Sequence, residues 1–256
     1  MRLVPVMSSD DNFNMQSYSD WANIKLELGY QSGNFPEIIS LPKYVNIGKF
    51  VSIIDKFILF TTEEYITDNS ENNNITFSKI RFEFLNRTIG RFEHLDISKW
   101  NSRNAVYDKH SKILWLGLSR SFNFADCLQI KNAIEDVSDI TVRFIELIAD
   151  TELRDCLSNV IINSFDISFV CVDSTKISKY SLYVLSEWYS LIKVSEEDSL
   201  MGVCNSIVIG DTIIPSKISK DFSKKLSDKI INVSISDIYN LSRCGSGDIA
   251  IFIEYA

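Results

Sequence analysis

The stretch AVYDKHSKILWLGLSRSFNFADCLQIKNAIED, Ala105–Asp136, has the clearest pattern of secondary structure in the chain. It predicts a β-hairpin, with strands at Ala105–Asp108 and Ile113–Leu118, followed by a helix. The second strand is almost entirely apolar, which is typical of a strand buried on both faces. Asn123, just before the helix, has the short polar side chain that caps helix N-termini. The stretch therefore predicts one strand–strand–helix unit.

Two details of this unit make further predictions. Gly117 interrupts the second strand near its end, which indicates a bend or a close approach of another backbone. The helix should bury one apolar stripe against the sheet. By helical spacing, that stripe consists of Phe124, Leu128, Ile130 and Ile134.

The same pattern returns along the chain at intervals of about fifty residues, as in repeat architectures. Phe50–Phe60 reads as two β-rich runs around Asp55-Lys56, and Asn205–Pro215 as two more around a Gly210-Asp211 turn. A looser copy begins at Ile167 and continues into a long predicted helix, Ile177–Val194, with Tyr180, Tyr183 and Trp188 on its apolar side. Strands that alternate with helices predict the α/β class.

Composition and charge exclude several classes of protein. The net charge of −8 argues against nucleic acid or an anionic membrane as a partner, because phosphate groups would repel the chain. We expect neither a signal peptide nor a membrane span. The five cysteines form no C-x-x-C pair, which predicts reduced core thiols in a cytoplasmic protein, with no metal site and no cofactor.

The distribution of polar residues predicts two parts. Residues 1–34 are polar and mixed, and we interpret them as an N-terminal extension. Residues 35–256 carry the repeated pattern and are predicted to form a single domain, which is an ordinary size for one hydrophobic core.

Two segments resemble a known family. Leu116–Asn123, LGLSRSFN, resembles the G-L-S-x-R-T-N segment of dimethylarginine dimethylaminohydrolases. Asn205–Ser236 resembles the hairpin, helix and VDVSE strand near the end of the same enzymes. The chain is thus similar, over about residues 35–256, to the pentein superfamily of guanidino-group-modifying enzymes, which also includes arginine deiminases and amidinotransferases. The resemblance implies an α/β propeller, a fan of five ββαβ units around a central pocket.

The resemblance also implies a chemistry, from which this sequence departs. In the family a cysteine attacks the guanidinium carbon, a histidine transfers protons, and carboxylates bind the guanidinium nitrogens. The family's acidic G-G-D segment corresponds here to Asn101–Val106, which has no carboxylate. The histidine motif falls near Thr151–Cys156, where Glu152 stands instead. The last strand lacks the expected cysteine, and Cys244 lies a few residues before it.

Six residues are nevertheless candidates for a site. Cys244 lies in a glycine-rich turn beside Arg243, whose charge would lower a thiol pKa. His94, in an H-L-D sequence that resembles the family's histidine motif but precedes LGLS, and Glu152 are the candidate proton carriers. Candidates for substrate contacts are Asp155, Asp248 and Arg120.

Three hypotheses follow for function. The first is a catalytically degenerate relative that binds a small guanidino-type ligand or a protein partner. The alternative is a divergent cysteine-dependent amidinohydrolase, deiminase or amidinotransferase that acts on an arginine-like substrate through a covalent thiouronium intermediate. The third is a structural or inhibitory protein unrelated to this family, whose acidic surface binds a basic partner.

Overall fold

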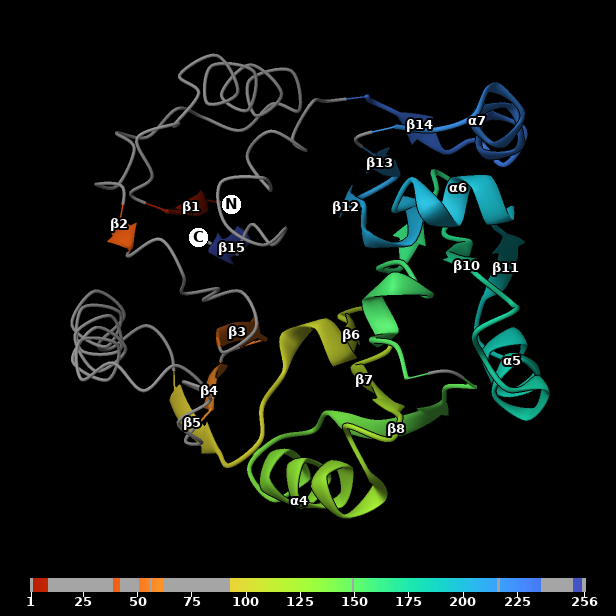
Figure 1. Ribbon diagram of the computed structural model, residues 1–256. Coiled ribbons are helices and arrows are strands. Elements are labelled where there is room, and N and C mark those ends of the chain that lie inside the picture. Colours follow the sequence, from red (N-terminus) through yellow and green to blue (C-terminus); the bar gives the residue numbers. More distant parts are fainter. Residues whose placement is uncertain are drawn as a thin grey trace. The chain divides into compact units, whose positions relative to one another are not determined.

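The structure, a computed structural model, describes residues 2–8, 39–41, 51–55, 57–61, 93–148, 150–215, 217–235 and 251–254. The chain divides into two compact units (Figure 1). The first unit comprises residues 1–102 and 238–256, and the second comprises residues 103–237. The candidate site that can be described in atomic detail belongs to the second unit.

The described strands form five three-stranded sheets, and all five have the same order of pairing. In each sheet the central strand is antiparallel to one neighbour and parallel to the other. The second unit contains β6 (Ala105–Asp108), β7 (Ile113–Leu118) and β8 (Thr141–Glu146); β9 (Ile161–Ile162), β10 (Ser168–Val172) and β11 (Ser190–Lys193); and β12 (Ile207–Ile209), β13 (Thr212–Ile214) and β14 (Asn232–Val233).

In the first unit, one sheet consists of β3 (Val51–Ile54), β4 (Phe57–Thr61) and β5 (Glu93–Ile97). The other places β1 (Arg2–Ser8) between β15 (Ile251–Glu254) and β2 (Ile39–Leu41), so that segments near both chain ends share one sheet. Strand β1 lies within the predicted N-terminal extension. The division into an extension of residues 1–34 and one domain stays a prediction.

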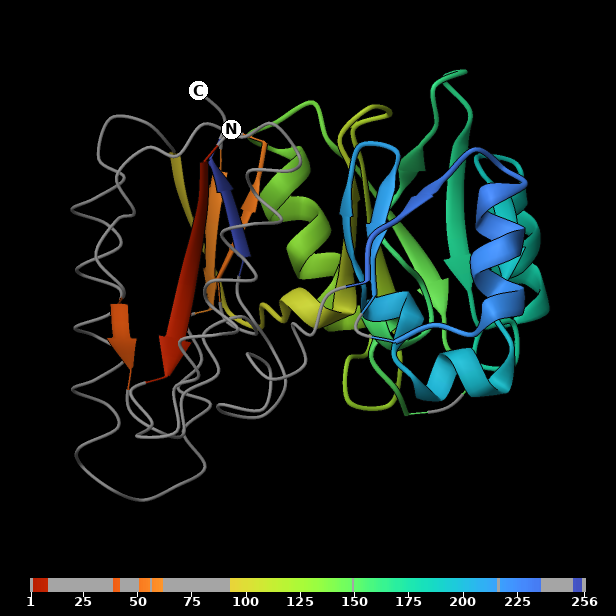
Figure 2. The same ribbon diagram turned by 90° about the horizontal axis from the view of Figure 1, so that it is seen from above.

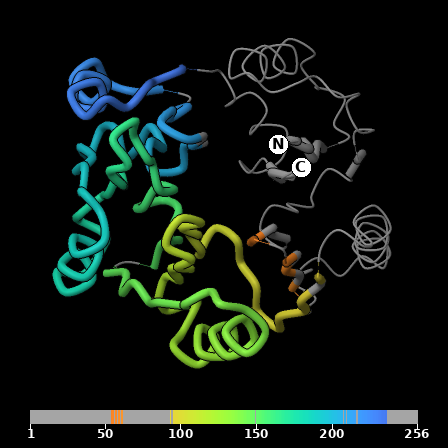
Figure 3. Tube along the Cα trace, turned by 180° about the vertical axis from the view of Figure 1, so that it is seen from behind, coloured from red at the N-terminus to blue at the C-terminus, as the bar shows by residue number. Residues whose placement is uncertain are grey.

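Each sheet of the second unit has its own helix, inserted between the central and the parallel strand. These helices are α4 (Phe124–Glu135), α5 (Lys179–Ser186) and α7 (Lys220–Ser227). Helix α4 packs on β7 and β8, α5 on β8 and β11, and α7 on β14 (Figures 1 and 2). The predicted repeat is therefore confirmed in this unit, and its three copies can be followed along the Cα trace in Figure 3.

Short helical segments fill the remaining described connections of the second unit. They are α6 (Glu196–Leu200) and the 3-10 turns η1 (Ser102–Asn104), η2 (Leu153–Asp155) and η3 (Val203–Asn205). None of the helices in the described ranges is long and apolar enough to cross a membrane.

The predicted hairpins are confirmed. Strands β6 and β7 have the bounds expected from the sequence and pair with Ala105 opposite Leu116. Strands β12 and β13 meet at Gly210, whose φ of 60° lies in the left-handed region that glycine tolerates without a steric cost. Strands β3 and β4 turn at Asp55, with φ of 52°. Aspartate is one of the few other residues that adopt this conformation.

The predicted cap of α4 is confirmed, but its predicted apolar stripe is wrong in part. The side chain of Asn123 accepts hydrogen bonds from the backbone of residues 125 and 126. Ile130 and Ile134 are buried as expected, whereas Phe124 is 58% and Leu128 38% exposed. Cys127 is fully buried in their place, because the inner face runs through positions 127, 130 and 134, and a thiol behaves there as a small apolar group.

The long helix predicted over Ile177–Val194 is wrong in its second half. Helix α5 ends at Ser186, and Ser190–Lys193 form β11, which pairs in parallel with β10. The backbone of β11 thereby forms hydrogen bonds with the backbone N–H and C=O groups along one edge of β10. This tertiary contact overrides the local helix propensity of Ser190–Lys193. Tyr180, Tyr183 and Trp188, expected on the apolar side, are exposed instead, and Leu185 is buried in the core.

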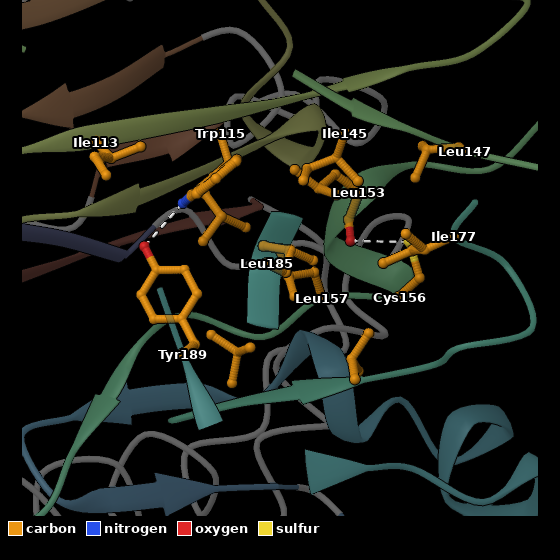
Figure 4. Close-up of a cluster of buried hydrophobic side chains, with 13 residues drawn as sticks. Ile113, Trp115, Ile145, Leu147, Leu153, Cys156, Leu157, Ile177, Leu185 and Tyr189 are labelled. Carbon is orange, nitrogen blue, oxygen red and sulfur yellow. Dashed lines mark hydrogen bonds between the residues drawn. The ribbon is translucent and has the colours of Figure 1, made fainter. Parts of the chain in front are cut away.

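The core beneath the candidate site is a cluster of buried side chains from the first two sheets of the second unit (Figure 4). The indole Nε1 of Trp115 donates to the Tyr189 hydroxyl at 2.8 Å, and this hydroxyl donates to the buried carboxylate of Asp108 at 2.9 Å. Leu153, from η2, is fully buried in the same cluster. The core therefore fixes the backbone of η2, on which the candidate carboxylates lie.

Candidate functional site

The structure brings two of the six predicted site residues together. Glu152 and Asp155 lie at the two ends of η2. Arg120 lies apart from these two residues in the sequence and is exposed in the connection between β7 and α4. His94 belongs to β5 in the first unit, where its backbone lies opposite Ile58, and its side chain is not among the described atoms. Cys244 and Asp248 lie outside the described residues.

Glu152 and Asp155 share one cation, the guanidinium group of Arg103. Nε of Arg103 donates to Glu152 Oε2, and Nη2 donates to Asp155 Oδ1 at 2.5 Å. The Arg103 side chain is 17% exposed, against 27% for Glu152 and 37% for Asp155. Two N–H donors of one planar guanidinium thus bind two different carboxylates through charge-assisted hydrogen bonds, which are stronger than hydrogen bonds between neutral groups.

Asn104 ties the carboxylate-bearing turn to the sheet. Its Nδ2 donates to the carbonyl oxygen of Gly117 at 2.5 Å, and its Oδ1 accepts from the backbone N–H of Leu153 at 3.2 Å. The Asn104 side chain is buried, so both bonds are shielded from water. A buried amide that is paired at both ends fixes the backbone segments that it joins.

Gly117 makes this approach possible. A Cβ atom built at Gly117 would lie well inside 3.0 Å of Asn104 Oδ1, 3.0 Å from Leu147 Cδ1 and 3.1 Å from Leu153 Cβ. No larger residue fits unless the amide or the turn moves. The close approach predicted from this glycine is confirmed in part, because the nearest atoms belong to side chains and not to another backbone.

The described thiols are poor nucleophiles. Cys127, Cys156, Cys171 and Cys204 are all buried and unpaired in disulfides. Burial raises the pKa of each thiol, to about 12 for Cys127, Cys156 and Cys171 and well above the ordinary value for Cys204. Cys156 adjoins the site, but its Sγ lies against the carbonyl oxygen of Leu153 at 3.3 Å (Figure 4). Since the thiolate is the reactive form, these four groups are inert at neutral pH.

Arg103 and Asn104 were not among the predicted site residues. Both lie in the segment that corresponds to the family's acidic G-G-D motif. The available signal was the sign of the charge, because a cation there implies an anionic partner elsewhere. The residues near Arg103 in the sequence do not indicate which residue that partner is, because Arg103 and Glu152 are 49 positions apart. Within the described ranges, no group of three or more His, Cys, Asp or Glu side chains is placed to hold a metal ion.

Comparison with known proteins gives matches in structure. No family model matches the sequence, and no curated protein sequence matches it. The N-terminal domain of ArgZ, an arginine dihydrolase from the ornithine-ammonia cycle in cyanobacteria, bound to its substrate, matches with a TM-score of 0.67 at 14% identity. This match covers 95% of each chain. AgrE, in a ternary complex with ornithine and NAD+, matches with a TM-score of 0.69 at 13% identity, over 97% of this chain and 38% of AgrE.

A third solved structure extends the comparison to the enzymes that the LGLSRSFN segment resembles. DDAH from Pseudomonas aeruginosa, in complex with citrulline, matches with a TM-score of 0.60 at 12% identity. The match covers 92% of this chain and 88% of DDAH. At such low identity the likeness concerns the path of the chain and not its chemistry. This protein has the mixed α/β fold of the pentein superfamily of guanidino-group-modifying enzymes.

Proposed function

We propose that this protein is a non-catalytic relative of the guanidino-group-modifying enzymes, which binds a small guanidino-type ligand or a protein partner. The observation that carries the proposal is the engagement of Glu152 and Asp155 by Arg103. By the resemblance to this family, Glu152 occupies the position at which the enzymes have the histidine that transfers protons. Here its carboxylate instead belongs to a structural ion pair.

The state of the thiols supports the non-catalytic assignment. Attack on a guanidinium carbon needs a thiolate at neutral pH. The four described thiols are buried and have pKa values of about 12 or above the ordinary range. Of the five cysteines in the sequence, only Cys244 remains a candidate nucleophile for the alternative, an active amidinohydrolase, deiminase or amidinotransferase.

The class of ligand is supported by what the structural neighbours bind. A variant of AgrE forms a complex with L-arginine, and DDAH from Pseudomonas aeruginosa forms one with citrulline. A shared fold alone does not carry a ligand from one protein to another. The pairing of a guanidinium with Glu152 and Asp155 is an independent sign, from this chain's own residues, that these carboxylates suit such a group.

Three further proposals concern architecture and location. The common order of the five sheets supports five ββαβ units arranged as an α/β propeller. The repeated pattern over residues 35–256 supports one domain, and the proposed extension of residues 1–34 contributes β1 to one of the five sheets. The free, buried thiols support a reducing, cytoplasmic location, since thiols stay reduced there.

Labelling of thiols in the folded protein tests the proposal. Wild type and Cys244→Ser are treated at neutral pH with 2-chloroacetamidine, an electrophile shaped like a guanidino group, and analysed by intact mass. We expect no rapid adduct on either folded protein, whereas the denatured wild type should label on all five cysteines. Rapid labelling that L-arginine blocks and that Cys244→Ser abolishes would overturn the proposal in favour of the enzyme.

A further inference from the structure

The connection between α7 and β14 (Figure 1) places Ile230 at φ of 58°, in the left-handed region. The helix ends there in a Schellman motif. The N–H of Ile230 donates to the carbonyl oxygen of Ser227 at 2.9 Å, and the N–H of Ile231 donates to that of Leu226 at 3.0 Å. Glycine is the usual residue at this position, because it has no Cβ atom that crowds the backbone. A β-branched side chain with positive φ is a clear outlier, so the fold carries strain at Ile230.

The core gains little from the side chain at this strained position. Leu226 and Ile231, which close the motif, are buried, whereas Ile230 is 50% exposed. Glycine in its place would relieve the strain and would remove a side chain that solvent half surrounds. A strained position whose side chain is exposed to this extent favours a role in contact with another molecule.

Two more large apolar residues are exposed beside Ile230. Phe165 and Ile167, in the turn between β9 and β10, are 66% and 46% exposed. Asn163, which is buried, joins this turn to the end of α7, because its Nδ2 donates to the carbonyl oxygen of Lys229 at 3.0 Å. Its Oδ1 accepts from the N–H groups of Phe165 and Ile167 at 3.0 and 3.1 Å. The three apolar residues thus lie where two segments, 66 positions apart at this hydrogen bond, are tied together.

Positive charge gathers around this junction. The charged residues exposed on α7, on its flanks and in the turn between β9 and β10 are Lys217, Lys220, Lys224, Lys225, Lys229, Asp166, Asp221 and Asp228. Five positive and three negative charges give a balance of +2, in a chain whose net charge is −8. A partner that offers carboxylates next to apolar side chains complements both the charge and the apolar residues.

From these observations we infer that Phe165, Ile167 and Ile230 form the apolar centre of a docking surface, the Ile230 surface, for a protein segment that carries carboxylates beside apolar side chains. The inference rests on the protein-binding half of the proposed function, for which it names the surface and the chemistry of the partner. The apolar side chains are covered on binding, and the surrounding lysines orient the carboxylates. A second copy of this chain fits less well, because a two-fold contact would bring the two positive rims against each other.

Binding of an acidic and apolar peptide tests the inference. The probe is the peptide Glu-Leu-Leu-Glu-Asp-Leu-Phe-Glu, blocked at both ends, and isothermal titration calorimetry measures its affinity for the full chain. We expect saturable binding in the micromolar range. The same peptide with Gln and Asn in place of Glu and Asp should bind about tenfold more weakly, because the lysines then meet no charge.

Two substitutions separate the side chain of Ile230 from its strain. Ile230→Gly removes both, so we expect the unfolding midpoint to rise by about 3 °C and peptide binding to weaken about fivefold. Ile230→Met keeps an apolar side chain without the β-branch, and it should bind the peptide within about twofold of wild type. A variant that is more stable and yet binds less well cannot owe its loss of binding to unfolding.

Two further variants complete the test. Leu200→Ala is the control, because Leu200 in α6 is 83% exposed and apolar but is not part of the Ile230 surface; it should leave the affinity unchanged. Phe165→Ser should weaken binding as Ile230→Gly does, and it replaces that variant if Ile230→Gly does not fold.

Several outcomes would overturn the inference. One is the absence of saturable binding, and another is equal binding of the acidic and the neutral peptide. Unchanged affinity in Ile230→Gly, or in Phe165→Ser where the former does not fold, would exclude the surface. Sedimentation that shows a wild-type dimer which Ile230→Gly dissociates would assign the surface to a second copy of the chain instead.

The outcome is distinguishable from that of the labelling experiment. Rapid labelling of Cys244 would end the non-catalytic proposal, yet peptide binding that depends on Ile230 would still identify the docking surface. Failure of the peptide to bind would end this inference and leave the labelling result unchanged.

Discussion

Two turns of the second unit satisfy their carboxylates in different ways. After β10, Asp173 is 5% exposed, and its carboxylate accepts hydrogen bonds from Thr175 Oγ1 at 2.6 Å, Ser199 Oγ at 2.5 Å and Lys176 Nζ at 3.0 Å. Two of these three partners lie within three positions of Asp173. In the turn at η2, Glu152 and Asp155 are more exposed, and their shared partner Arg103 is 49 and 52 positions away.

The two turns differ in how far along the chain each carboxylate finds its partners. Asp173 is surrounded by several short-range donors on one chain segment and on α6, so no single displacement releases it. Glu152 and Asp155 share the guanidinium of Arg103, which reaches them across 49 and 52 positions of the chain. Removal of Arg103 therefore disturbs both carboxylates of the η2 turn at once, whereas removal of one partner of Asp173 leaves its other donors in place.

The largest expected effect concerns the support beneath the η2 turn. Gly117→Ala puts a Cβ into the space of Asn104 Oδ1 and close to Leu153, so the amide bridge has to break or the turn has to shift. We expect a loss of about 3 kcal/mol in the free energy of unfolding, from overpacking and an unpaired buried amide. Urea denaturation measures it.

Gly210→Ala is the matched control for Gly117→Ala. A Cβ at Gly210 would meet nothing within 4 Å, and its cost comes only from the φ of 60°. We expect a loss of about 1 kcal/mol there. If Gly117→Ala costs no more than Gly210→Ala, close packing does not hold the η2 turn, and the fixed spacing of its carboxylates loses its support.

The sequence predicts those parts of the fold that depend on neighbours along the chain. The hairpin β6–β7 and the Asn123 cap follow from residues within a few positions of one another, and both are confirmed. The end of α5 was missed, because Ser190–Lys193 become a strand only when β10 offers its edge. In the site, Glu152 and Asp155 were found through the resemblance. Arg103 was not, since a contact across 49 positions leaves no local pattern.

The next effect concerns the local network itself and its dependence on pH. Burial would raise the pKa of Asp173, but hydrogen bonds from Ser199, Thr175 and Lys176 outweigh it and lower the pKa from 3.8 to about 2. Because the folded-state pKa is the lower one, the stabilisation is present above about pH 4 and is lost as the pH falls toward 2. We expect Asp173→Asn to lose about 2 kcal/mol at pH 7 and almost nothing near pH 2.

Urea denaturation across this pH range measures the Asp173 effect, with Asp139→Asn as the control. Asp139 pairs with Lys112 at the surface, and its side chain is 67% exposed. We expect a change below about 0.5 kcal/mol for this exposed pair at any pH. An equal loss in both variants would mean that enclosure by local donors adds nothing, and the contrast between the two turns would fail.

The smallest effect concerns the cap of α4, which has local partners like Asp173 but lies at the surface like the η2 carboxylates. Asn123 Oδ1 accepts from Ala125 N at 2.8 Å and from Asp126 N at 3.2 Å, and Asp126 Oδ2 accepts from Asn123 N at 3.2 Å. Asn123→Ala removes the acceptor, and we expect the free energy of unfolding, measured by urea denaturation, to fall by about 1 kcal/mol.

Asn123→Asp is the control, because it keeps an acceptor next to the positive end of the helix dipole. It should cost less than half as much, although its charge lies near Asp126. If both variants cost the same, the side-chain acceptor is not what stabilises this end of α4. The closeness of the capping residues in the sequence would then not explain why the start of α4 could be predicted.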